Sequence, residues 1–445
     1  MQTSRKAVSG TTIGLVVVIV IVLAGFGAYV AFYTPGATTI TSVSTINTTA
    51  TSTATSVSTA TSVATTVSTA TSVSTSVSTS VSTSISTTNN YLPSATVNGG
   101  GGTLVFPLME DWINTYSSLQ PNIQVSYSAL GSGHGISGIT TGLYQFGESD
   151  APLTSAQYAA LPNGSSLLTI PISDSGIVPA YNLPGIAAHL NFTGNVLAEI
   201  FYGTITQWND ARLQTLNPGV VLPADAIQVV HRSDGSGTMY GFTQFLSFSN
   251  STWAKNIGFS TGTIAWPVGV GKPHNSGVAQ YIAATSYTLG PLEIAYEISN
   301  PGQINYGTVQ NHYGNFILAN LTNISQAVAA GVSGGLPTTS AQWSTFSVIR
   351  ATFNDSSDKF IYPVSTMTYA LVYQDLSASY AATSQAQAVA TVNFLSWIVN
   401  DGQGTGPYSP NTTLGYPPLP SAAVTLDNQL LATITFNGTP VLSGS

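Results

Sequence analysis

The segment AIQVVHRSDGSGTMYGFTQFLSF, residues 226–248, joins a strand-like run to a helix-like run through a glycine-containing turn. The run AIQVVH is short and largely apolar, as in a buried β-strand, whereas GFTQFLSF has apolar residues at helical spacing. The turn between them exposes backbone N–H groups where the helix begins. Because the first four amides of a helix lack partners within it and carry partial positive charge, this junction is suited to bind an anion.

Two other glycine-rich segments occupy the same kind of junction, GGGGTLVF at residues 99–106 and ALGSGHGISGI at residues 129–139. Each of the three junctions carries hydroxyl groups, which add further donors: Thr103, Ser132, Ser236 and Thr238. A single Gly-Ser turn is most often a plain connector. Three helix N-termini that converge would hold an oxyanion without a metal ion or other cofactor.

Strand-like and helix-like runs alternate through the remaining chain, which predicts an α/β fold. The expected strands are GTLVF (102–106), IQVSYSAL (123–130), GIVPAYNL (176–183), AIQVVH (226–231), FIYPVS (360–365) and TYALVYQ (368–374). The expected helices are DWINTYSSL (111–119), GNVLAEIFYG (194–203), GFTQFLSF (241–248) and AQAVATVNFLSWIV (386–399). In such folds ligands bind at the carboxyl ends of the strands.

Two charged residues stand out beside the turn at 235–237. Arg232 is one of only 8 Lys and Arg residues in the chain, and its guanidinium fork matches an oxyanion bidentately. The alternative is a surface arginine or an ion pair with Asp234. Asp234 itself would either orient Arg232 or cap the following helix.

Asp150 lies in the segment FGESDAPLT, residues 146–154. A carboxylate near an anion site repels the ligand unless the ligand carries a proton, as hydrogen phosphate does and sulfate does not. Facing sulfate, this carboxylate would remain a buried acceptor without a donor. The alternative from sequence alone is an aspartate that forms a turn before Ala-Pro.

The order of these motifs resembles the phosphate-binding protein of the high-affinity phosphate ABC transporter, a family of type II periplasmic-type binding proteins. The resemblance runs from about Asn98 to Val424. It rests on GGGGT at Gly99, GSG at Gly131, FGESDAPLT at Phe146, LAEIFYGTITQWND at Leu197, LNPGVVLP at Leu216, HRSDGSGT at His231 and WPVGVG at Trp266.

The resemblance implies a set of phosphate contacts: Thr103, the amide of Leu104, Ser132, Asp150, Arg232, Ser236, Gly237 and Thr238. It also implies that Asp234 pairs with Arg232. Two α/β lobes would close around the anion, lobe 1 from residues 92–172 and 365–445 and lobe 2 from residues 173–364. The closed lobes would then dock on a membrane permease.

The chain departs from the family pattern at two places. Leu104 stands where the family usually has an aromatic residue, and Gly133 and His134 replace a second Ser and a Gly after Ser132. His134 would either approach the anion when protonated or face solvent, and we expect the second. The missing hydroxyl at Gly133 would lower affinity or relax selectivity toward arsenate.

The composition restricts the function classes. Only 5% of the 445 residues are charged, the net charge is -8, and there is no cysteine. Nucleic acid is excluded as a partner, because binding the phosphate backbone requires clustered Lys and Arg. Disulfides, thiolate metal sites and cysteine nucleophiles are excluded as well.

The first 33 residues predict a membrane anchor. Residues 1–12 contain Arg5 and Lys6 and would lie in the cytoplasm, while Ile13–Tyr33 is an apolar run long enough to span a bilayer. The alternatives are a cleaved signal peptide and a pilin-type signal that is cut ahead of the run. A retained anchor would place everything after Tyr33 outside the cell.

Residues 34–91 repeat Ser, Thr, Val and Ala without charges, which predicts an extended extracellular stalk suited to O-glycans. Asn-x-Ser/Thr sequons occur at Asn47, Asn163, Asn191, Asn250, Asn320, Asn323, Asn354, Asn411 and Asn437, as in a glycoprotein.

We therefore expect a tethered receptor for inorganic phosphate that serves an importer. One alternative is a receptor for another oxyanion, and another is a cell-surface structural or adhesion protein that reuses the fold. An enzyme such as a phosphatase is not expected, because an HExxH motif is absent and GVGKP fails the Walker pattern.

Overall fold

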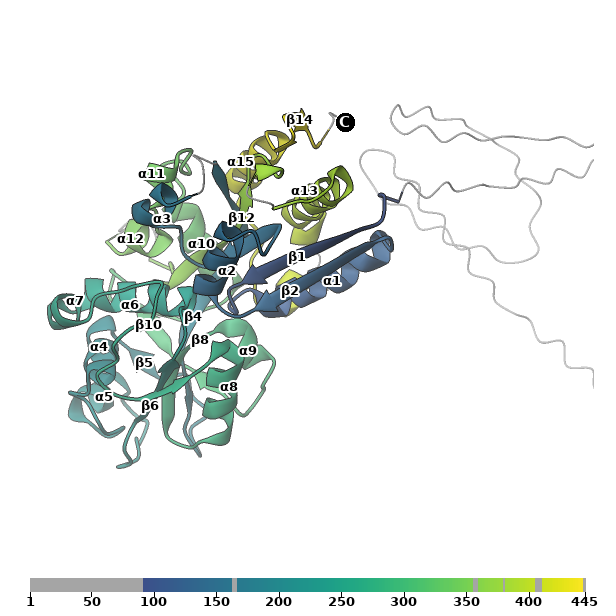
Figure 1. Cartoon of the computed structure of the whole chain (residues 1–445). Coiled ribbons are helices and arrows are strands. Elements are labelled where there is room, and N and C mark those ends of the chain that lie inside the picture. Colours follow the sequence, from purple (N-terminus) through teal and green to yellow (C-terminus); the bar gives the residue numbers. More distant parts are fainter. Residues whose placement is uncertain (1–90, 162–165, 355–358, 379–380, 405–409, 443–445) are drawn as a thin grey trace, which may run out of the picture. The chain divides into compact units, whose positions relative to one another are not determined.

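The computed structural model describes residues 91–161, 166–354, 359–378, 381–404 and 410–442 (Figure 1). Residues Asn90–Ser445 form one compact unit. The predicted cytoplasmic segment 1–12, the anchor 13–33 and all but the last residue of the stalk 34–91 lie outside the described residues. No helix in the described ranges is long and apolar enough to span a bilayer.

One nine-stranded sheet runs through the compact unit in the order β2-β1-β3-β12-β4-β8-β6-β7, with β9 paired to β4. The pairs β1–β2, β1–β3, β6–β8 and β6–β7 are parallel, and β12 and β4 run antiparallel to their neighbours. A smaller sheet has the order β11-β10-β5, and β13 pairs with β14.

Strand β4 (Leu167–Asn182) connects the two halves of the large sheet. Its residues 167–176 pair with β12, and its residues 177–182 pair with β8. A register shift occurs where Tyr369 pairs with Pro171 and Thr368 with Ser173, so Ile172 is an extra residue in β4. Such a bulge bends a strand, and here it precedes the passage between the two halves. The lobe boundaries at 172/173 and 364/365 stay predictions.

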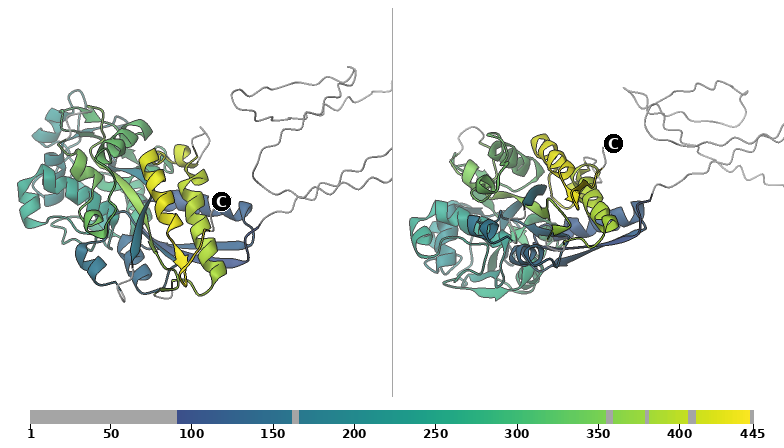
Figure 2. Two further views of the ribbon diagram at one scale, coloured as in Figure 1. Left: turned by 90° about the horizontal axis from the view of Figure 1, so that it is seen from above. Right: turned by 45° about the horizontal axis from the view of Figure 1, so that its top comes forward.

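The first half of the sheet is flanked by helices from both ends of the compact unit (Figures 1 and 2). Helix α2 packs on β1 and β3, whereas α13 packs on β1, α1 and α15. Besides β4, its elements are β1 (Ala95–Gly101), α1 (Phe106–Leu119), β2 (Ile123–Ala129), α2 (Ser132–Thr140), β3 (Phe146–Ser149), α3 (Ser155–Ala159), β12 (Ser365–Tyr373), α13 (Gln385–Val399), α14 (Pro410–Thr413), α15 (Ser421–Ala432), β13 (Thr435–Phe436) and β14 (Thr439–Pro440).

The second half is built from the chain between β4 and β12. Helix α8 packs on β8 and β6, and α6 packs on α4 and α12. Its elements are β5 (Asn191–Phe192), α4 (Gly194–Tyr202), α5 (Ala211–Leu216), β6 (Gln228–Arg232), α6 (Gly237–Ser249), α7 (Ser251–Asn256), β7 (Val270–Lys272), α8 (His274–Ala284), β8 (Thr288–Glu293), α9 (Ile294–Ile298), β9 (Asn305–Tyr306), β10 (Thr308–Gln310) and β11 (Phe316–Ile317). The same stretch of chain ends with α10 (Leu321–Gly331), α11 (Ser340–Trp343) and α12 (Val348–Thr352), which pack on β12 and α3 of the first half.

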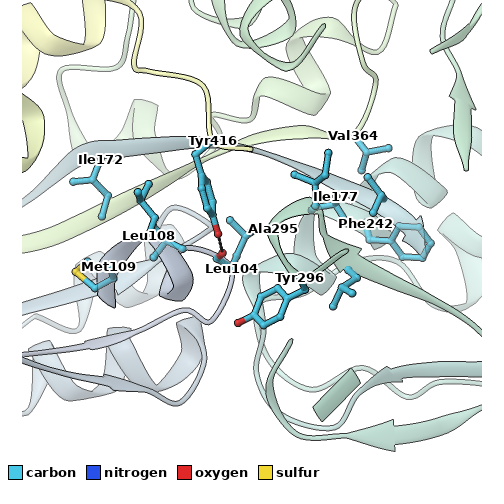
Figure 3. Packing of buried hydrophobic residues seen from close by; sticks show 14 of the residues in the cluster. Leu104, Leu108, Met109, Ile172, Ile177, Phe242, Ala295, Tyr296, Val364 and Tyr416 are labelled. Atoms are coloured by element: carbon cyan, nitrogen blue, oxygen red, sulfur yellow. Dashed lines mark hydrogen bonds between the residues drawn. The ribbon is translucent and has the colours of Figure 1, made fainter. Parts of the chain in front are cut away.

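The buried core holds its large aromatic residues through both packing and hydrogen bonds. The indole N–H of Trp112 donates to the carbonyl of Gly402 at 2.8 Å, and that of Trp253 donates to Gly258 at 3.0 Å. A buried indole needs such a partner for its one polar atom. Tyr416 likewise donates to the carbonyl of Leu104 at 2.6 Å, inside the apolar cluster drawn in Figure 3.

The α/β class is confirmed, and so are the four predicted helices and the strands at 123–130, 176–183, 226–231 and 368–374. Two predicted strands are wrong. GTLVF forms a turn and the first residue of α1, a start that Pro107 favours because it lacks an N–H. FIYPVS contributes only Ser365 to β12. Its apolar residues Ile361, Tyr362 and Val364 are buried in the core without forming a strand, so their hydrophobicity was misleading.

Candidate anion-binding site

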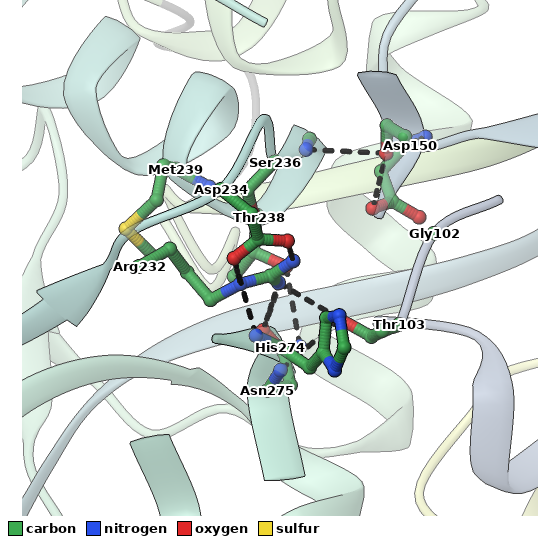
Figure 4. Close-up of polar contacts among 12 residues, drawn as sticks. Gly102, Thr103, Asp150, Arg232, Asp234, Ser236, Thr238, Met239, His274 and Asn275 are labelled. Atoms are coloured by element: carbon green, nitrogen blue, oxygen red, sulfur yellow. Dashed lines mark hydrogen bonds and ion pairs between the residues drawn. The ribbon is translucent and has the colours of Figure 1, made fainter. Parts of the chain in front are cut away.

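The three predicted junctions come together at the carboxyl ends of β1, β2 and β6, where α1, α2 and α6 begin. The amide of Gly237 in α6 donates to Ser132 Oγ at the start of α2 at 3.1 Å. Arg232, at the end of β6, donates to Thr103 Oγ1 in the β1–α1 turn at 2.8 Å. Side chains from both halves of the sheet therefore contact one another at a single place (Figure 4).

Arg232 is the cation of this site and is 2% exposed. Its Nε donates to Asp234 Oδ1 at 2.8 Å, and its Nη2 pairs with Asp234 Oδ2. Its Nη1 reaches Thr103 Oγ1 and, at 2.7 Å, Asn275 Oδ1. The planar fork is thus fixed on two sides, which leaves its orientation little freedom.

Asp234 orients Arg232 and also binds a helix start, although not the one expected. Its Oδ1 accepts the amide of His274, the first residue of α8, at 3.1 Å. Helix α6 is capped instead by Ser236, whose Oγ accepts the amide of Met239 at 3.3 Å. Burial raises the pKa of Asp234, but the hydrogen bonds and charge of Arg232 outweigh it and keep this pKa below its usual value.

Ser132 and Asp150 form the part of the site that belongs to the first half of the sheet. Ser132 Oγ donates to Asp150 Oδ2 at 2.9 Å and accepts the amide of Asp150 at 3.1 Å. Asp150 is 2% exposed and Ser132 is fully buried. Burial raises the pKa of Asp150, although contacts with Glu148 and Ser132 and the charge of Arg232 favour its ionised form.

The remaining predicted residues lie in the same cluster. Thr238 is fully buried, and its Oγ1 accepts from Asn275 Nδ2 at 3.2 Å. Ser236 and Gly237 are the cap and first residue of α6. Leu104 is fully buried, and its carbonyl accepts from Tyr416. The structure therefore brings all eight predicted contact residues, and Asp234, to one region.

The two halves of the site fit closely against each other. A Cβ on Gly237 would lie 2.4 Å from Asp150 Cβ and 2.7 Å from Ser132 Oγ. A Cβ on Gly131, whose φ is +98°, would lie 2.5 Å from the carbonyl oxygen of Gly235. Tyr296 in α9 also donates to the carbonyl of Thr103 at 2.7 Å. The two halves of the sheet are therefore in direct contact at the site.

Asn275 was not predicted from the sequence, although it forms hydrogen bonds with several residues of the site. Besides Arg232 and Thr238, it reaches Thr103 Oγ1 through its backbone amide at 3.1 Å. It follows β7 (VGK) and Pro273 at the start of α8, which is a fourth strand–turn–helix junction. That junction is the signal that could have identified it.

Two other carboxyl groups near the site were also not predicted. Glu148 and Glu293 are fully buried. Burial raises the pKa of Glu293 to about 8, although it accepts the amide of Ala295 and the hydroxyls of Tyr416 and Ser175. Burial, followed by repulsion from Asp150, raises the pKa of Glu148 well above its usual value.

One of the residues that depart from the family pattern, His134, is not placed as expected. His134 does not simply face solvent: it is partly buried, and its Nε2 is 2.8 Å from the hydroxyl of Tyr144.

Of the four glycines at 99–102, the first three belong to β1 and not to a turn. A Cβ on Gly99 would lie 2.1 Å from the ring of Phe146, and one on Gly100 would lie 2.4 Å from that of Tyr144.

Comparisons with known proteins show which family the chain belongs to. A family model described as a PBP superfamily domain matches residues 36–401. The phosphate-binding protein PstS of Xylella fastidiosa (strain 9a5c) is 32% identical over 328 residues, covering 74% of this chain and 82% of that protein. The PstS of the archaeon Methanocaldococcus jannaschii is 30% identical over 326 residues, covering 71% and 82%.

Solved structures support the fold. The phosphate-binding protein from Stenotrophomonas maltophilia superposes with a TM-score of 0.53 at 18% identity, covering 75% of this chain and 93% of that chain. At that identity the likeness concerns the two-lobed fold alone, and family membership rests on the sequence matches. The chain belongs to the PstS family of phosphate-binding proteins, within the PBP superfamily.

Proposed function

We propose that this chain captures inorganic phosphate in the cleft between its two lobes and delivers it to the permease of a phosphate ABC transporter. Members of the family are substrate-binding proteins and not enzymes, and no bond is made or broken in this function. The observation that carries the proposal is the placement of a buried carboxyl, Asp150, within one cluster with a buried guanidinium, Arg232.

This pairing matches the chemistry of hydrogen phosphate. The anion's unprotonated oxygens would accept hydrogen bonds from Arg232, Thr103, Ser132 and the first amides of α6. Its P–O–H group would donate to Asp150. An anion without a proton would leave the buried carboxylate facing an oxygen with no hydrogen between them, which costs about 1–3 kcal/mol or more.

Phosphate would favour the closed form because its donors come from both lobes. Thr103, Ser132 and Asp150 belong to the first half of the sheet, and Arg232 through Thr238 belong to the second. A ligand that contacts both halves at once stabilises the conformation in which they meet. The bulge in β4 and the return of the chain before β12 are the positions at which the hinge would bend.

We propose in addition that residues 13–33 anchor the chain in the cell membrane, with the stalk 34–91 holding the binding domain outside the cell. The apolar length of Ile13–Tyr33 and the basic Arg5 and Lys6 support this orientation. The sequons and the Ser/Thr-rich repeats support glycosylation.

The function is tested by titration calorimetry of the compact unit Asn90–Ser445 with phosphate, followed by sulfate. We expect tight phosphate binding, no competition by sulfate at equal concentration, and a loss of at least about 100-fold in Arg232→Ala because a charged bidentate contact disappears. Asp150→Asn should weaken phosphate binding and admit sulfate, since an amide can donate to it.

The alternatives give different results. Another oxyanion that binds more tightly than phosphate, in the wild-type protein, would change the ligand assignment. If the folded protein binds no oxyanion, that result would favour a structural or adhesive role. Hydrolysis of a phosphoester that disappears in Ser132→Ala would revive the enzyme hypothesis.

A further inference from the structure

A second buried carboxyl group, that of Glu148 in β3, lies directly beside Asp150. A Cβ placed on Gly102 would lie 2.4 Å from Glu148 Oε2 and 2.8 Å from each carboxyl oxygen of Asp150. Both carboxyl groups therefore approach the same point of the β1–α1 turn, where glycine leaves room for them. Glu148 is fully buried, so water does not separate its charge from that of Asp150.

Each of these carboxyl groups has one oxygen that is satisfied and one that is not. Glu148 Oε2 lies 2.9 Å from the hydroxyl of Tyr127, which also lies 2.8 Å from the carbonyl oxygen of Gly102, and Asp150 Oδ2 accepts the hydroxyl of Ser132 at 2.9 Å. Within the described residues, Glu148 Oε1 and Asp150 Oδ1 are buried without a hydrogen-bond partner. An unsatisfied buried acceptor costs about 1–3 kcal/mol, and two ionised carboxyl groups this close also repel each other.

One proton held by the pair removes both penalties, because a protonated carboxyl donates to its ionised neighbour. Arg232 is the cation of the site, and it is already paired with Asp234. The other titratable groups packed around the pair carry no positive charge: Tyr127, Glu293, Tyr296, Tyr369 and Tyr416. Nothing in this surrounding set compensates a second negative charge.

We infer that Glu148 is a specificity-determining residue of the phosphate site: it shares one proton with Asp150, and anion binding fails when that proton leaves. The inference rests on the proposed function. While the proton is present, the pair carries one negative charge, and Asp150 accepts the anion's hydroxyl. Once it is lost, two negative charges lie beside the anion, and the attraction of Arg232 is offset.

The test is the pH dependence of phosphate affinity in the full-length chain, wild type against Glu148→Gln, from about pH 4 to about pH 9. A glutamine reproduces the neutral carboxyl, because its carbonyl can accept from Tyr127 and its amide can donate to Asp150. It cannot ionise. We expect the two affinities to agree within about threefold at acid pH and the variant to bind at least about tenfold more tightly at alkaline pH.

The ratio of the two affinities is the readout, since phosphate's own second ionisation affects both proteins equally. A ratio that stays constant with pH, whatever its value, would refute the role of Glu148 and leave the receptor function intact. If the wild-type protein binds phosphate at no pH in this range, the proposed function is refuted instead. Glu293→Gln is the matched control. If this variant alone keeps its phosphate affinity at alkaline pH, the effect belongs to Glu293.

A second variant keeps the inference testable if Glu148→Gln does not fold. Tyr127→Phe removes the hydroxyl that stabilises the ionised form of Glu148, so the proton would be held to higher pH. We expect its phosphate affinity to decline at a higher pH than in the wild type. A decline at the same pH as in the wild type, or at a lower pH, would contradict the shared proton.

Discussion

Arg232 shows how the site fixes a buried charge without neutralising it completely. Asp234 holds one edge of the guanidinium, while Thr103 and Asn275 hold Nη1. A buried charge needs this degree of hydrogen bonding, because an unpaired cation in the interior is strongly destabilising. Asp234 is more exposed than Arg232, with 22% of its side chain accessible against 1%, so the cation is the deeper partner.

Asn275 should be required to align this cation. Asn275→Ala removes the bonds to Arg232 and Thr238, and we expect phosphate affinity to fall about tenfold, the equivalent of roughly one to two hydrogen bonds. Calorimetry measures the change. The matched control is Ser276→Ala, one residue further along α8 and exposed, which should bind as the wild type does. Equal affinities for the two variants would show that Asn275 has no role in binding.

Arg232 and Asp150 could be singled out from the sequence, whereas Asn275 could not. Arg232 stood out because the chain has so few bases, and Asp150 because a carboxylate beside an anion site demands a protonated ligand. Asn275 is one asparagine among many in a chain rich in polar uncharged residues. Its role depends on how close α8 lies to β6, which is a tertiary contact that local sequence does not encode.

At the scale of elements, the decisive contact is between the first turns of α2 and α6. These helix starts come from different halves of the sheet, and Gly237 packs directly against Ser132 and Asp150. Any side chain at position 237 would occupy space that belongs to the opposite half. Glycine there is required by the close approach of the two elements.

Gly237→Ala should therefore obstruct closure while leaving each lobe folded. We expect phosphate affinity to fall at least about tenfold, because overpacking a tight contact costs about 1–3 kcal/mol. Calorimetry gives the affinity, and small-angle scattering should show no compaction on adding phosphate. Gly277→Ala in α8 is the control, since its Cβ would meet only an ordinary contact at 3.4 Å. Normal closure in Gly237→Ala would contradict the assigned contact.

Gly101 provides a test of the strand itself. Its φ is +157°, and a Cβ would lie 2.0 Å from the carbonyl oxygen of Glu148. Gly101→Ala should lower the free energy of unfolding by at least about 2 kcal/mol, because the backbone of β1 and β3 must separate. Gly334→Ala, where a Cβ meets nothing within 4 Å, should change it by less than about 0.5 kcal/mol. Urea unfolding measures both.

Four of the predicted strands were found, but the strand that connects the two halves of the sheet was predicted only in part. The run at 176–183 was recognised, but β4 begins at Leu167 and contains Pro171 and Pro179. Prolines within a run argue against a strand, because proline cannot donate to a neighbour. Pro171 is accommodated next to the bulge at Ile172, and this depends on the register with β12. That register is a property of the folded sheet.

At the scale of the whole molecule, the unusual feature is where the charges are. Three ion pairs occur within the described residues, and two of them share Arg212. By contrast, Asp174 in β4 and Asp427 in α15 are fully buried, and in the described part of the chain none of their four carboxyl oxygens has a hydrogen-bond partner. We therefore expect stability to depend little on surface charge and strongly on the protonation of these buried acids.

The direction of the pH dependence follows from these buried acids. Burial raises the pKa of Asp174 and of Asp427 well above the usual value of an aspartate, and the charge of Asp174 raises that of Asp427 further. The folded chain then holds protons that the unfolded chain has lost. The stabilisation is fully present below the unfolded pKa of about 4 and is lost as pH rises toward the folded pKa, at about 1.4 kcal/mol for each pH unit and each such group.

We accordingly expect the compact unit Asn90–Ser445 to have a larger free energy of unfolding at about pH 4 than at about pH 7, the reverse of a protein held by ion pairs. Asp427→Asn cannot ionise, so it should lose less stability over this range than the wild type. Urea unfolding at the two pH values measures the difference. The control is Asp401→Asn, an exposed carboxyl, which should keep the wild-type slope. A wild-type protein that is less stable in acid would show that these carboxyl groups ionise inside the fold, with partners that compensate them.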